Sequence, residues 1–259
     1  MNAAPPGAPG RLYLVPAPLD FGAAVLAPLQ DQLPDGTLQV AARLRHWICE
    51  NAKSLRHYLG RVDAVHPLAA PLQTLHIQEL PRSVHKKGDH QGGVDATPWL
   101  AAARKGQDIG LVSEAGMPAI ADPGASVIRA AHTLGLEVVA LSGPVSLMLA
   151  LASSGLNGQN FAFVGYLPTD PAARARRLRE LEGLVQRTGQ TQLFIETPYR
   201  NAALLQALLA TLAPSTRLAI SSGLVTPSAR TTSATVAQWR SRAPAGPDNA
   251  TPAVYAIGS

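Results

Sequence analysis

The fold is decided by residues 108–154, which read DIGLVSEAGMPAIADPGASVIRAAHTLGLEVVALSGPVSLMLALASS. Apolar strand-like runs occupy 108–113 and 137–141, and helical patterns occupy 125–134 and 145–154. Loops rich in glycine, alanine, serine and proline separate each strand from the helix that follows it. A repeated strand–loop–helix order predicts parallel strands joined by crossover helices. We therefore expect an α/β fold whose N-terminal half holds a doubly wound, mostly parallel sheet.

The same pattern extends less regularly toward the N-terminus. A strand over 11–15 is stopped by two prolines, and a helix over 39–59 precedes a strand over 73–80. The other expected features are a poorly defined helix over 21–32, a polar glycine-rich loop over 83–94, and a helix that Thr97 caps and that runs to Lys105.

A second half begins near Asn157 and contains more strands per residue. Strands are expected over 161–164, 192–195, 217–221 and 253–257, and helices over 171–186, 199–212 and 235–242. This distribution favours a mixed sheet. We expect two α/β domains, an N-terminal one over 11–156 and a C-terminal one over 157–259.

The composition limits the class of protein. The chain has 259 residues, of which 46% are hydrophobic and 15% charged, which excludes a disordered chain. The net charge of +5 modestly favours an anionic partner such as RNA. A single cysteine, Cys49, excludes an internal disulfide framework and a cysteine-rich zinc site, and a cytoplasmic location is expected. No secretory signal and no membrane span are expected.

Three loops follow strands and are built from small residues: 16–18, 114–124 and 142–145. Ligands of open α/β sheets bind beyond the carboxyl ends of the strands, and small residues let the backbone approach a ligand closely. These loops are either a nucleotide-like cofactor site or simply tight turns. The dinucleotide and P-loop glycine motifs are absent. His85 and His90 lack further ligand-type neighbours, so no metal is expected.

Five motifs, in order, make the chain resemble the tetrapyrrole methylase superfamily. Residues 111–124 resemble its "V-S-D-A-G-x-P-x-I-x-D-P-G" loop, and residues 12–18 resemble "L-Y-x-V-x-T-P". Residues 141–144, 163–168 and 194–200 are similar to "L-P-G-P", "x-x-G-F-L-P" and "F-Y-E-S-x-x-R". The match is nearest to the branch that methylates a ribose 2′-hydroxyl of small-subunit ribosomal RNA.

The resemblance implies two α/β domains with a cleft between them, S-adenosylmethionine as cofactor, and a homodimer. RNA is a possible partner, whereas DNA and membranes are not expected. The positions that the resemblance assigns to the cofactor come from both domains. They are Pro16, Ala17, Gly116, Met117, Ala119, Ile120, Ser142, Pro144, Val145, Ser146, Leu147, Glu196, Thr197, Ser222, Pro252 and Ala253, with Ser221 as a weaker candidate.

The chain departs from the ribosomal branch at two substrate-side motifs. "G-N-L-x-D" is replaced over 19–23, and "E-D-T-R" becomes Glu50-Asn-Ala-Lys53. An amide at Asn51 replaces a carboxylate, and Lys53 keeps positive charge without the planar fork of arginine. The changes predict a side branch whose acceptor is not the ribosomal ribose, or is reached differently.

No catalytic residue is assigned from the sequence. Glu50, Lys53 and Glu196 are weak candidates, with Glu114 as a further possible base, because a hydroxyl acceptor needs a base within hydrogen-bond reach. Arginines at 174, 176, 177 and 179 either contact RNA phosphates or form a solvated helix face. The expected activity is S-adenosylmethionine-dependent methyl transfer. The alternatives are a small-molecule, tetrapyrrole-like methylase and a cofactor-binding protein without turnover.

Overall fold

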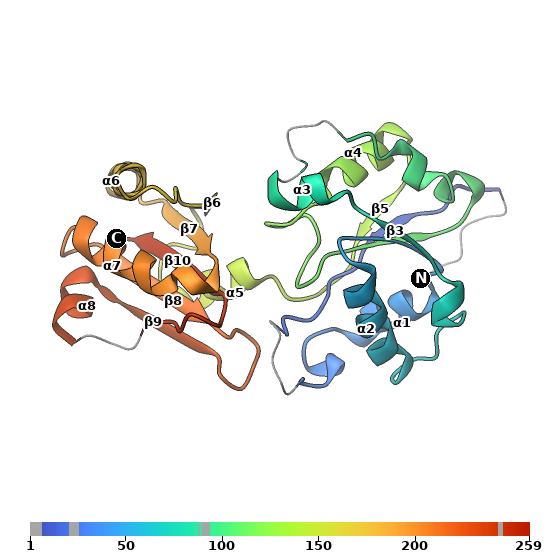
Figure 1. The fold of residues 1–259 in the computed structure, drawn as a ribbon, viewed down its shortest axis with the longest axis horizontal. Coiled ribbons are helices and arrows are strands. Elements are labelled where there is room, and N and C mark those ends of the chain that lie inside the picture. The colour runs from blue at the N-terminus through green and yellow to red at the C-terminus, as the bar shows by residue number, and fades with distance from the viewer. Residues whose placement is uncertain (1–6, 21–25, 88, 90–93, 243–245) are drawn as a thin grey trace. The chain divides into compact units, whose positions relative to one another are not determined.

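The computed structural model describes residues 7–20, 26–87, 89, 94–242 and 246–259, and its contacts divide the chain into two units (Figure 1). The first unit ends at Val145 and the second begins at Ser146. The expected boundary lies eleven residues later, after 156. Helix α5 (Ser146–Ser154) accounts for the difference because it packs on strands of the second unit.

The first unit contains a five-stranded sheet in which every strand pair is parallel, as predicted. Its order is β3-β2-β4-β1-β5, and each neighbouring pair runs in the same direction. The strands are β1 (Leu12–Leu14), β2 (His46–Cys49), β3 (His76–Glu79), β4 (Ile109–Val112) and β5 (Val138–Ala140). All five carboxyl ends therefore lie along one edge.

Helices cover both faces of this sheet because alternate residues of each strand point to opposite sides. Tyr13 and Trp47 belong to one buried cluster, and their neighbours Leu12 and Ile48 belong to another. The first cluster includes residues of α1 (Asp35–Arg43) and α2 (Ala52–Asp63), and the second includes residues of α3 (Arg82–Lys87) and α4 (Ala125–Thr133). Short 3-10 turns occupy Leu29–Asp31, Leu72–Thr74, Thr97–Leu100 and Ala103–Lys105.

The prediction of a single helix over 39–59 is wrong. The structure has the end of α1, then β2, then α2. Leu44, Trp47 and Ile48 fit helical spacing, but β2 lies between β3 and β4, where both faces of a strand are covered and an unbroken apolar run is required. Trp47 is 1% exposed there. The run of four residues was too short for its period to distinguish strand from helix.

Three smaller expectations in this half also change. The helix predicted from Thr97 to Lys105 consists of two 3-10 turns. The loop predicted over 83–94 contains most of α3. Of the helix predicted over 21–32, residues 21–25 lie outside the described part, and the rest contains the 3-10 turn at Leu29–Asp31.

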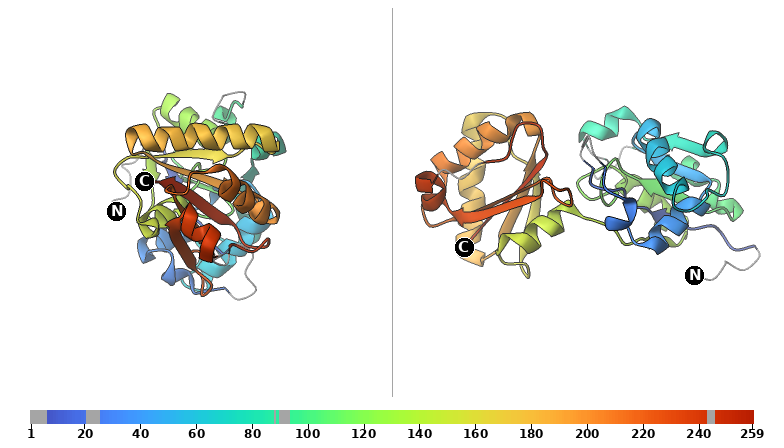
Figure 2. Two further views of the ribbon diagram at one scale, coloured as in Figure 1. Left: turned by 90° about the vertical axis from the view of Figure 1, so that its left-hand side faces the viewer. Right: turned by 90° about the horizontal axis from the view of Figure 1, so that it is seen from below.

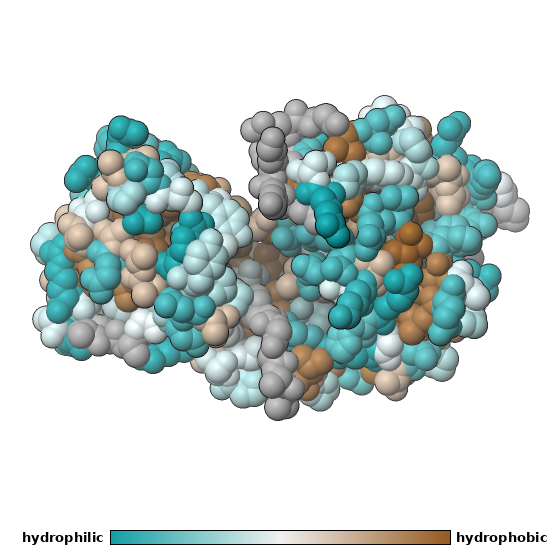
Figure 3. Space-filling model, in the orientation of Figure 1, coloured by the Kyte–Doolittle hydropathy of each residue, from teal (hydrophilic) through white to brown (hydrophobic). Residues whose placement is uncertain are grey.

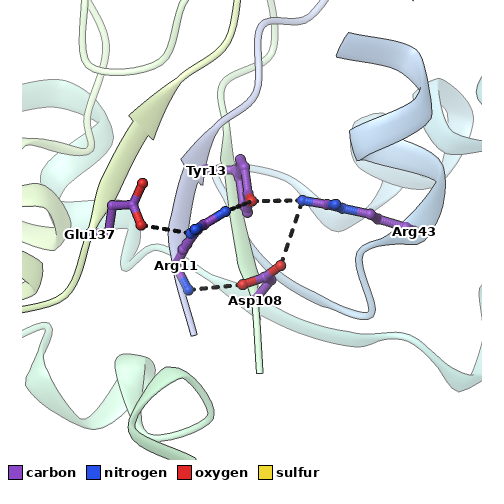
Figure 4. A network of polar contacts seen from close by, with 5 residues as sticks. All are labelled: Arg11, Tyr13, Arg43, Asp108 and Glu137. Atoms are coloured by element: carbon purple, nitrogen blue, oxygen red, sulfur yellow. Dashed lines mark hydrogen bonds and ion pairs between the residues drawn. The ribbon is translucent and has the colours of Figure 1, made fainter. Parts of the chain in front are cut away.

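Charged side chains tie the amino-terminal edge of this sheet together (Figure 4). The backbone N–H of Arg11 donates to Asp108 Oδ1 at 2.9 Å, and its guanidinium pairs with Glu137 at 2.6 Å. Arg43 donates to the buried hydroxyl of Tyr13 at 2.6 Å. Arg11, Asp108 and Glu137 each precede a strand, so ionic contacts hold one edge while small-residue loops form the other.

The second unit has the expected mixed sheet, ordered β6-β7-β10-β8-β9. Only β6 and β7 pair in parallel; the other pairs are antiparallel. The strands are β6 (Phe161–Tyr166), β7 (Thr191–Glu196), β8 (Arg217–Ser222), β9 (Arg230–Thr235) and β10 (Ala253–Gly258). Strand β9 was not predicted because its sequence, RTTSAT, has no apolar alternation, as an edge strand with both faces partly open allows.

Three helices and the sheet of the second unit share one buried cluster, which includes Phe194, Tyr255 and Trp239. The helices are α6 (Pro171–Thr188), α7 (Asn201–Thr211) and α8 (Val236–Arg242), and a 3-10 turn at Pro198–Arg200 precedes α7. Figure 2 shows α6 lying along this sheet. Helix α5 contacts β8, β9 and β10 but contributes nothing to that cluster.

On the face shown in Figure 3, hydrophilic residues dominate each unit and hydrophobic ones form separate patches. Within the described ranges, no helix combines the length and apolar character that a membrane span requires.

The N-terminus of α4 is capped by a residue from a distant part of the chain. The Asp89 carboxylate accepts from the backbone N–H groups of Gly124 at 3.0 Å, Ala125 at 3.1 Å and Ser126 at 2.9 Å. Burial alone would raise the pKa of Asp89, but these hydrogen bonds and one from the Ser126 hydroxyl outweigh it and lower the pKa. The cap thus fixes the end of the 114–124 loop.

We expect Asp89→Ala to lower the free energy of unfolding by about 1–2 kcal/mol at pH 7, the usual cost of a lost N-cap. A depressed native pKa stabilises the fold above the unfolded pKa, near 3.9, and this contribution disappears as the pH falls through the native value. The difference between the two proteins, measured by urea unfolding, should therefore shrink below about pH 4. Asp95→Ala is the control, since Asp95 caps only the exposed turn at Thr97; an equal loss in both variants would contradict the prediction.

Candidate functional site

The loops that follow β1 and β4 are joined by backbone hydrogen bonds. The N–H of Ala17 donates to the Gly116 carbonyl at 2.9 Å, and the N–H of Gly116 donates to the Ala17 carbonyl at 3.0 Å. Because β1 and β4 are neighbours in the sheet, both loops leave the same edge. This pair locks the two loops together one turn beyond the strand ends.

The loop after β5 meets the same junction. A Cβ on Gly143 would lie 2.3 Å from Pro16 Cγ, so only glycine permits this contact. A Cβ on Gly116, whose φ is +69°, would lie 3.4 Å from the Pro144 carbonyl oxygen. The Thr37 hydroxyl of α1 donates to the Ser142 carbonyl at 2.8 Å and so fixes the loop after β5. The three loops predicted from sequence are thus adjacent.

The cofactor candidates of the first unit occupy this junction at different depths. Pro16, Ala17, Gly116 and Pro144 are buried, so they offer backbone groups or apolar surface. The more accessible candidates are Met117, Ala119, Ile120, Ser142 and Val145.

The segment 119–121 is strained. Ala119 has φ +63° and Ala121 has φ +66°, the left-handed region that costs a non-glycine residue about 1–2 kcal/mol. Between them, Ile120 is 44% exposed although it is a large apolar side chain. Backbone strain and an exposed apolar residue in one loop are typical of ligand contact.

A cavity of about 750 Å³ opens beside the junction, within the first unit. Its walls come from the loops after β1 and β4, from the end of β4, and from α2 between Lys53 and Arg61. The lining residues are Ala17, Pro18, Asp20, Leu26, Lys53, Ser54, Leu55, His57, Tyr58, Arg61, Val112, Ser113, Glu114 and Ala115. Its volume falls within the range of small-molecule and cofactor pockets.

Three of the weak catalytic candidates lie at this end of the first sheet. Glu50 follows β2, and Glu114 follows β4, whose last residue pairs with the last residue of β2. The Ser54 hydroxyl donates to Glu114 Oε1 at 2.8 Å. Lys53 is exposed and lines the cavity. The structure therefore brings Glu50, Lys53 and Glu114 into one neighbourhood.

The departure at Asn51 has a structural explanation. Asn51 is the N-cap of α2, and its side-chain oxygen accepts from the N–H groups of Lys53 at 2.8 Å and Ser54 at 3.2 Å. Asparagine and aspartate cap helices about equally well. Replacement of the branch's acid by Asn51 thus preserves the cap.

Sequence reasoning missed three residues here. Burial first, and then the negative charges of Glu50 and Glu114, raise the pKa of Asp122 to about 7. The hydroxyls of Tyr58 and Ser113 are buried at the cavity and have no hydrogen-bond partner among the described residues. Asp122 lies in the 111–124 loop that resembles the family motif, so its position in that motif could have identified it. Nothing in the sequence around Tyr58 on α2 points to a site.

The second unit also brings several candidates together. Ala253 at the start of β10 pairs with Glu196 at the end of β7 and with Ser222 at the end of β8. Pro252 and Thr197 adjoin this row. Glu196 is buried and holds Arg200 at 2.8 Å, and its other oxygen, Oε2, lacks a hydrogen-bond partner in the described part of the chain.

The remaining candidates are more dispersed. Ser146 and Leu147 begin α5, and Leu147 is buried in the protein. Among the arginines of α6, Arg177 pairs with Glu180 at 3.2 Å on an exposed face. His90 lies outside the described residues. Within the described residues, no three histidine, cysteine or acidic side chains are placed to hold a metal.

Comparison with known proteins gives consistent results. The family model for Tetrapyrrole (Corrin/Porphyrin) Methylases matches residues 37–239. Ribosomal RNA small subunit methyltransferase I of Pseudomonas aeruginosa is 36% identical over 112 residues, 43% of this chain and 38% of the relative. The protein of the same name in Escherichia coli O157:H7 is 30% identical over 80% of this chain and 62% of its own length. That of Xylella fastidiosa is 31% identical over 82% and 67%.

These alignments span between 38% and 67% of the relatives' own lengths. Among solved structures, uroporphyrin-III-C-methyltransferase from Thermus thermophilus has a TM-score of 0.53 at 19% identity, covering 96% of this chain and 94% of that one. The methyltransferase CobJ has a TM-score of 0.53 at 17% identity, with the same coverage. These two likenesses show the fold. With the family model matched from residue 37 to residue 239 and the expected sheets in place, the chain belongs to the tetrapyrrole methylase family.

Proposed function

We propose that the chain is an S-adenosylmethionine-dependent methyltransferase whose acceptor is a nucleotide of small-subunit ribosomal RNA. The observation that carries this proposal is the junction at Ala17 and Gly116, where three small-residue loops meet beside a cavity. Such a junction offers backbone groups to one ligand and leaves space for a second. The relatives named as ribosomal RNA methyltransferases supply the acceptor class.

The residues at the junction suit this cofactor. S-adenosylmethionine carries a cationic sulfonium and a neutral adenine, and it supplies an electrophilic methyl group. Carbonyl oxygens, small side chains and the apolar surfaces of Met117 and Ile120 match those features. No lysine or arginine occurs over 114–124 or 142–145, so the loops contain no cationic phosphate clamp. Pro16, Ala17, Gly116 and Pro144 would hold the cofactor through backbone and apolar contacts.

The exposed side chains at the cavity are compatible with an RNA acceptor. Lys53 and His57 are exposed and line it, and the whole chain carries a net charge of +5. Cations contribute most of the sequence-independent affinity for a phosphate backbone. Arg61 is paired with Asp20 in the same wall, so Lys53 is the cation better placed to contact a phosphate.

The deciding assay follows labelled methyl groups from S-adenosylmethionine into fractions of a lysate, before and after ribonuclease treatment. The proposal expects label in the small-subunit ribosomal RNA that ribonuclease releases. Label confined to small molecules would support the tetrapyrrole-like alternative, and cofactor binding without any transfer would support a binding protein. Light scattering tests the homodimer that the family resemblance implies.

Gly116→Ala should weaken binding of S-adenosylmethionine at least tenfold in calorimetry. The new Cβ would lie 3.2 Å from Leu19 Cδ2 and 3.4 Å from the Pro144 carbonyl, at the point where the loops meet. Gly135→Ala is the matched control, because Gly135 has nearly the same φ, +68°, but open space around it. Both variants bear a similar left-handed backbone cost. Equal affinities in the two variants would remove Gly116 from the proposed site.

Asn51→Asp should leave RNA methylation unchanged to within about threefold, because either side chain caps α2. Lys53→Ala should instead weaken RNA binding and reduce the slope of log affinity against log salt by roughly one phosphate contact. Arg56→Ala, an exposed cation on the same helix outside the cavity lining, serves as the control. A gain of activity in Asn51→Asp would show that the amide faces the acceptor.

A further inference from the structure

Features unfavourable to stability are concentrated around the cavity of the first unit. The negative charges of Glu50 and Glu114 both repel that of Asp122, and the loop that bears Asp122 is strained. The unpaired, buried hydroxyls of Tyr58 and Ser113 line the same cavity. Buried polar groups without partners and clustered like charges are uncommon unless a site uses them.

Of the three carboxyl groups, only Glu114 is among the described residues that line the cavity. Glu114 is exposed, lines the cavity and is oriented by the Ser54 hydroxyl at 2.8 Å. Asp122 is half-buried and lies in the chain between the left-handed Ala121 and the start of helix α4. Glu50 approaches from the neighbouring strand, since Cys49 and Val112 are register partners. Among the described residues, no group hydrogen-bonds the Asp122 carboxyl.

We propose that the cavity takes a hydroxyl-bearing acceptor and that Glu114 accepts the hydroxyl proton during methyl transfer. Asp122 and Glu50 are positioning residues that keep negative charge next to Glu114. The inference rests on the proposed function and adds to it the residues that handle the proton. The unpaired hydroxyls of Tyr58 and Ser113 can bond the bound acceptor, which explains why they have no partner within the protein.

The step balances as a direct displacement. The acceptor oxygen forms a bond to the methyl carbon while the carbon–sulfur bond of the sulfonium donor breaks, and that electron pair remains on sulfur. The hydroxyl proton passes to the carboxylate of Glu114. A base of this kind contributes typically a factor of about 10²–10⁴ to a proton-transfer reaction.

The cluster predicts how the rate depends on pH. Asp122 binds a proton below its raised pKa and is charged above it. A charged Asp122 adds negative charge near the reacting groups, which favours departure of the cationic proton from the acceptor hydroxyl. Methyl transfer should therefore speed up as the pH rises through about 7. Besides Glu114, the charged or titratable groups that line this cavity are Asp20, Lys53, His57, Tyr58 and Arg61.

The first test needs neither cofactor nor acceptor. Carboxyl-carbon NMR of the whole chain, with Asp122→Asn to assign the signal, should show Asp122 titrating near pH 7. Glu50→Gln removes a like charge and should lower that midpoint by about one unit. Glu180→Gln, an exposed acid on α6, should leave it unchanged. A midpoint near the ordinary value of about 4 overturns the proposal.

The second test measures transfer from labelled S-adenosylmethionine to extracted small-subunit RNA between pH 5.5 and 9. Glu114→Gln should lower the rate about 100-fold or more with cofactor affinity unchanged. Asp122→Asn should remove the rise near pH 7, and Glu50→Gln should move it to lower pH. His57→Gln should leave the rise in place; its disappearance there would assign the ionisation to His57 and overturn the proposal.

The two tests separate this inference from the proposed function. Failure to bind S-adenosylmethionine contradicts the proposed function, whereas the NMR titration still decides whether the carboxyl cluster exists. Normal binding and a full rate in Glu114→Gln would overturn the assignment of the base alone.

Discussion

Two backbone hydrogen bonds between Ala17 and Gly116 constrain the whole first unit. They form only if β1 and β4 are adjacent and parallel and if both loops turn toward each other immediately after their strands. They also require backbone freedom at residue 116, whose φ of +69° favours glycine. Once this pair is made, the loop after β5 can reach it only by passing Gly143 against Pro16. The contacts that fix the order of the strands therefore also fix the position of the site.

The two edges of the first sheet have different roles: the amino edge contributes ionic contacts, and the carboxyl edge carries the candidate site. Arg11, Asp108 and Glu137 make ion pairs and hydrogen bonds at the amino edge, where charges can face water. At the carboxyl edge, backbone contacts join the loops, and the Asp89 cap on α4, the Arg61–Asp20 ion pair and side-chain hydrogen bonds such as that from Ser54 to Glu114 support them. A site built from backbone groups needs its loops held in place by contacts of this kind, because the backbone groups themselves must stay free for the ligand.

Much of this arrangement could be predicted from the sequence because it follows from local patterns. The three loops are visible as runs of small residues after apolar strands, and the parallel order follows from the alternation over 108–154. Strand β2 was missed because four apolar residues between two helices keep helical spacing. The Asp89 cap and the approach of Asp122 to Glu50 join residues 35 to 72 positions apart. Single-sequence periodicity carries no information about such pairs.

The substitution at Asn51 shows how a family motif combines requirements of different kinds. Position 51 must accept hydrogen bonds from the N–H groups that begin α2, and asparagine does so as well as aspartate. Position 50 leads directly from β2 to the carboxyl cluster, and there the chain keeps the glutamate of the motif. Position 53 lies in the first turn of α2, in the cavity wall, where positive charge is kept although the side chain differs. Charge is thus preserved at position 50, beside the carboxyl cluster, and at position 53, in the cavity wall. It is lost only at position 51, whose side chain accepts hydrogen bonds from the backbone.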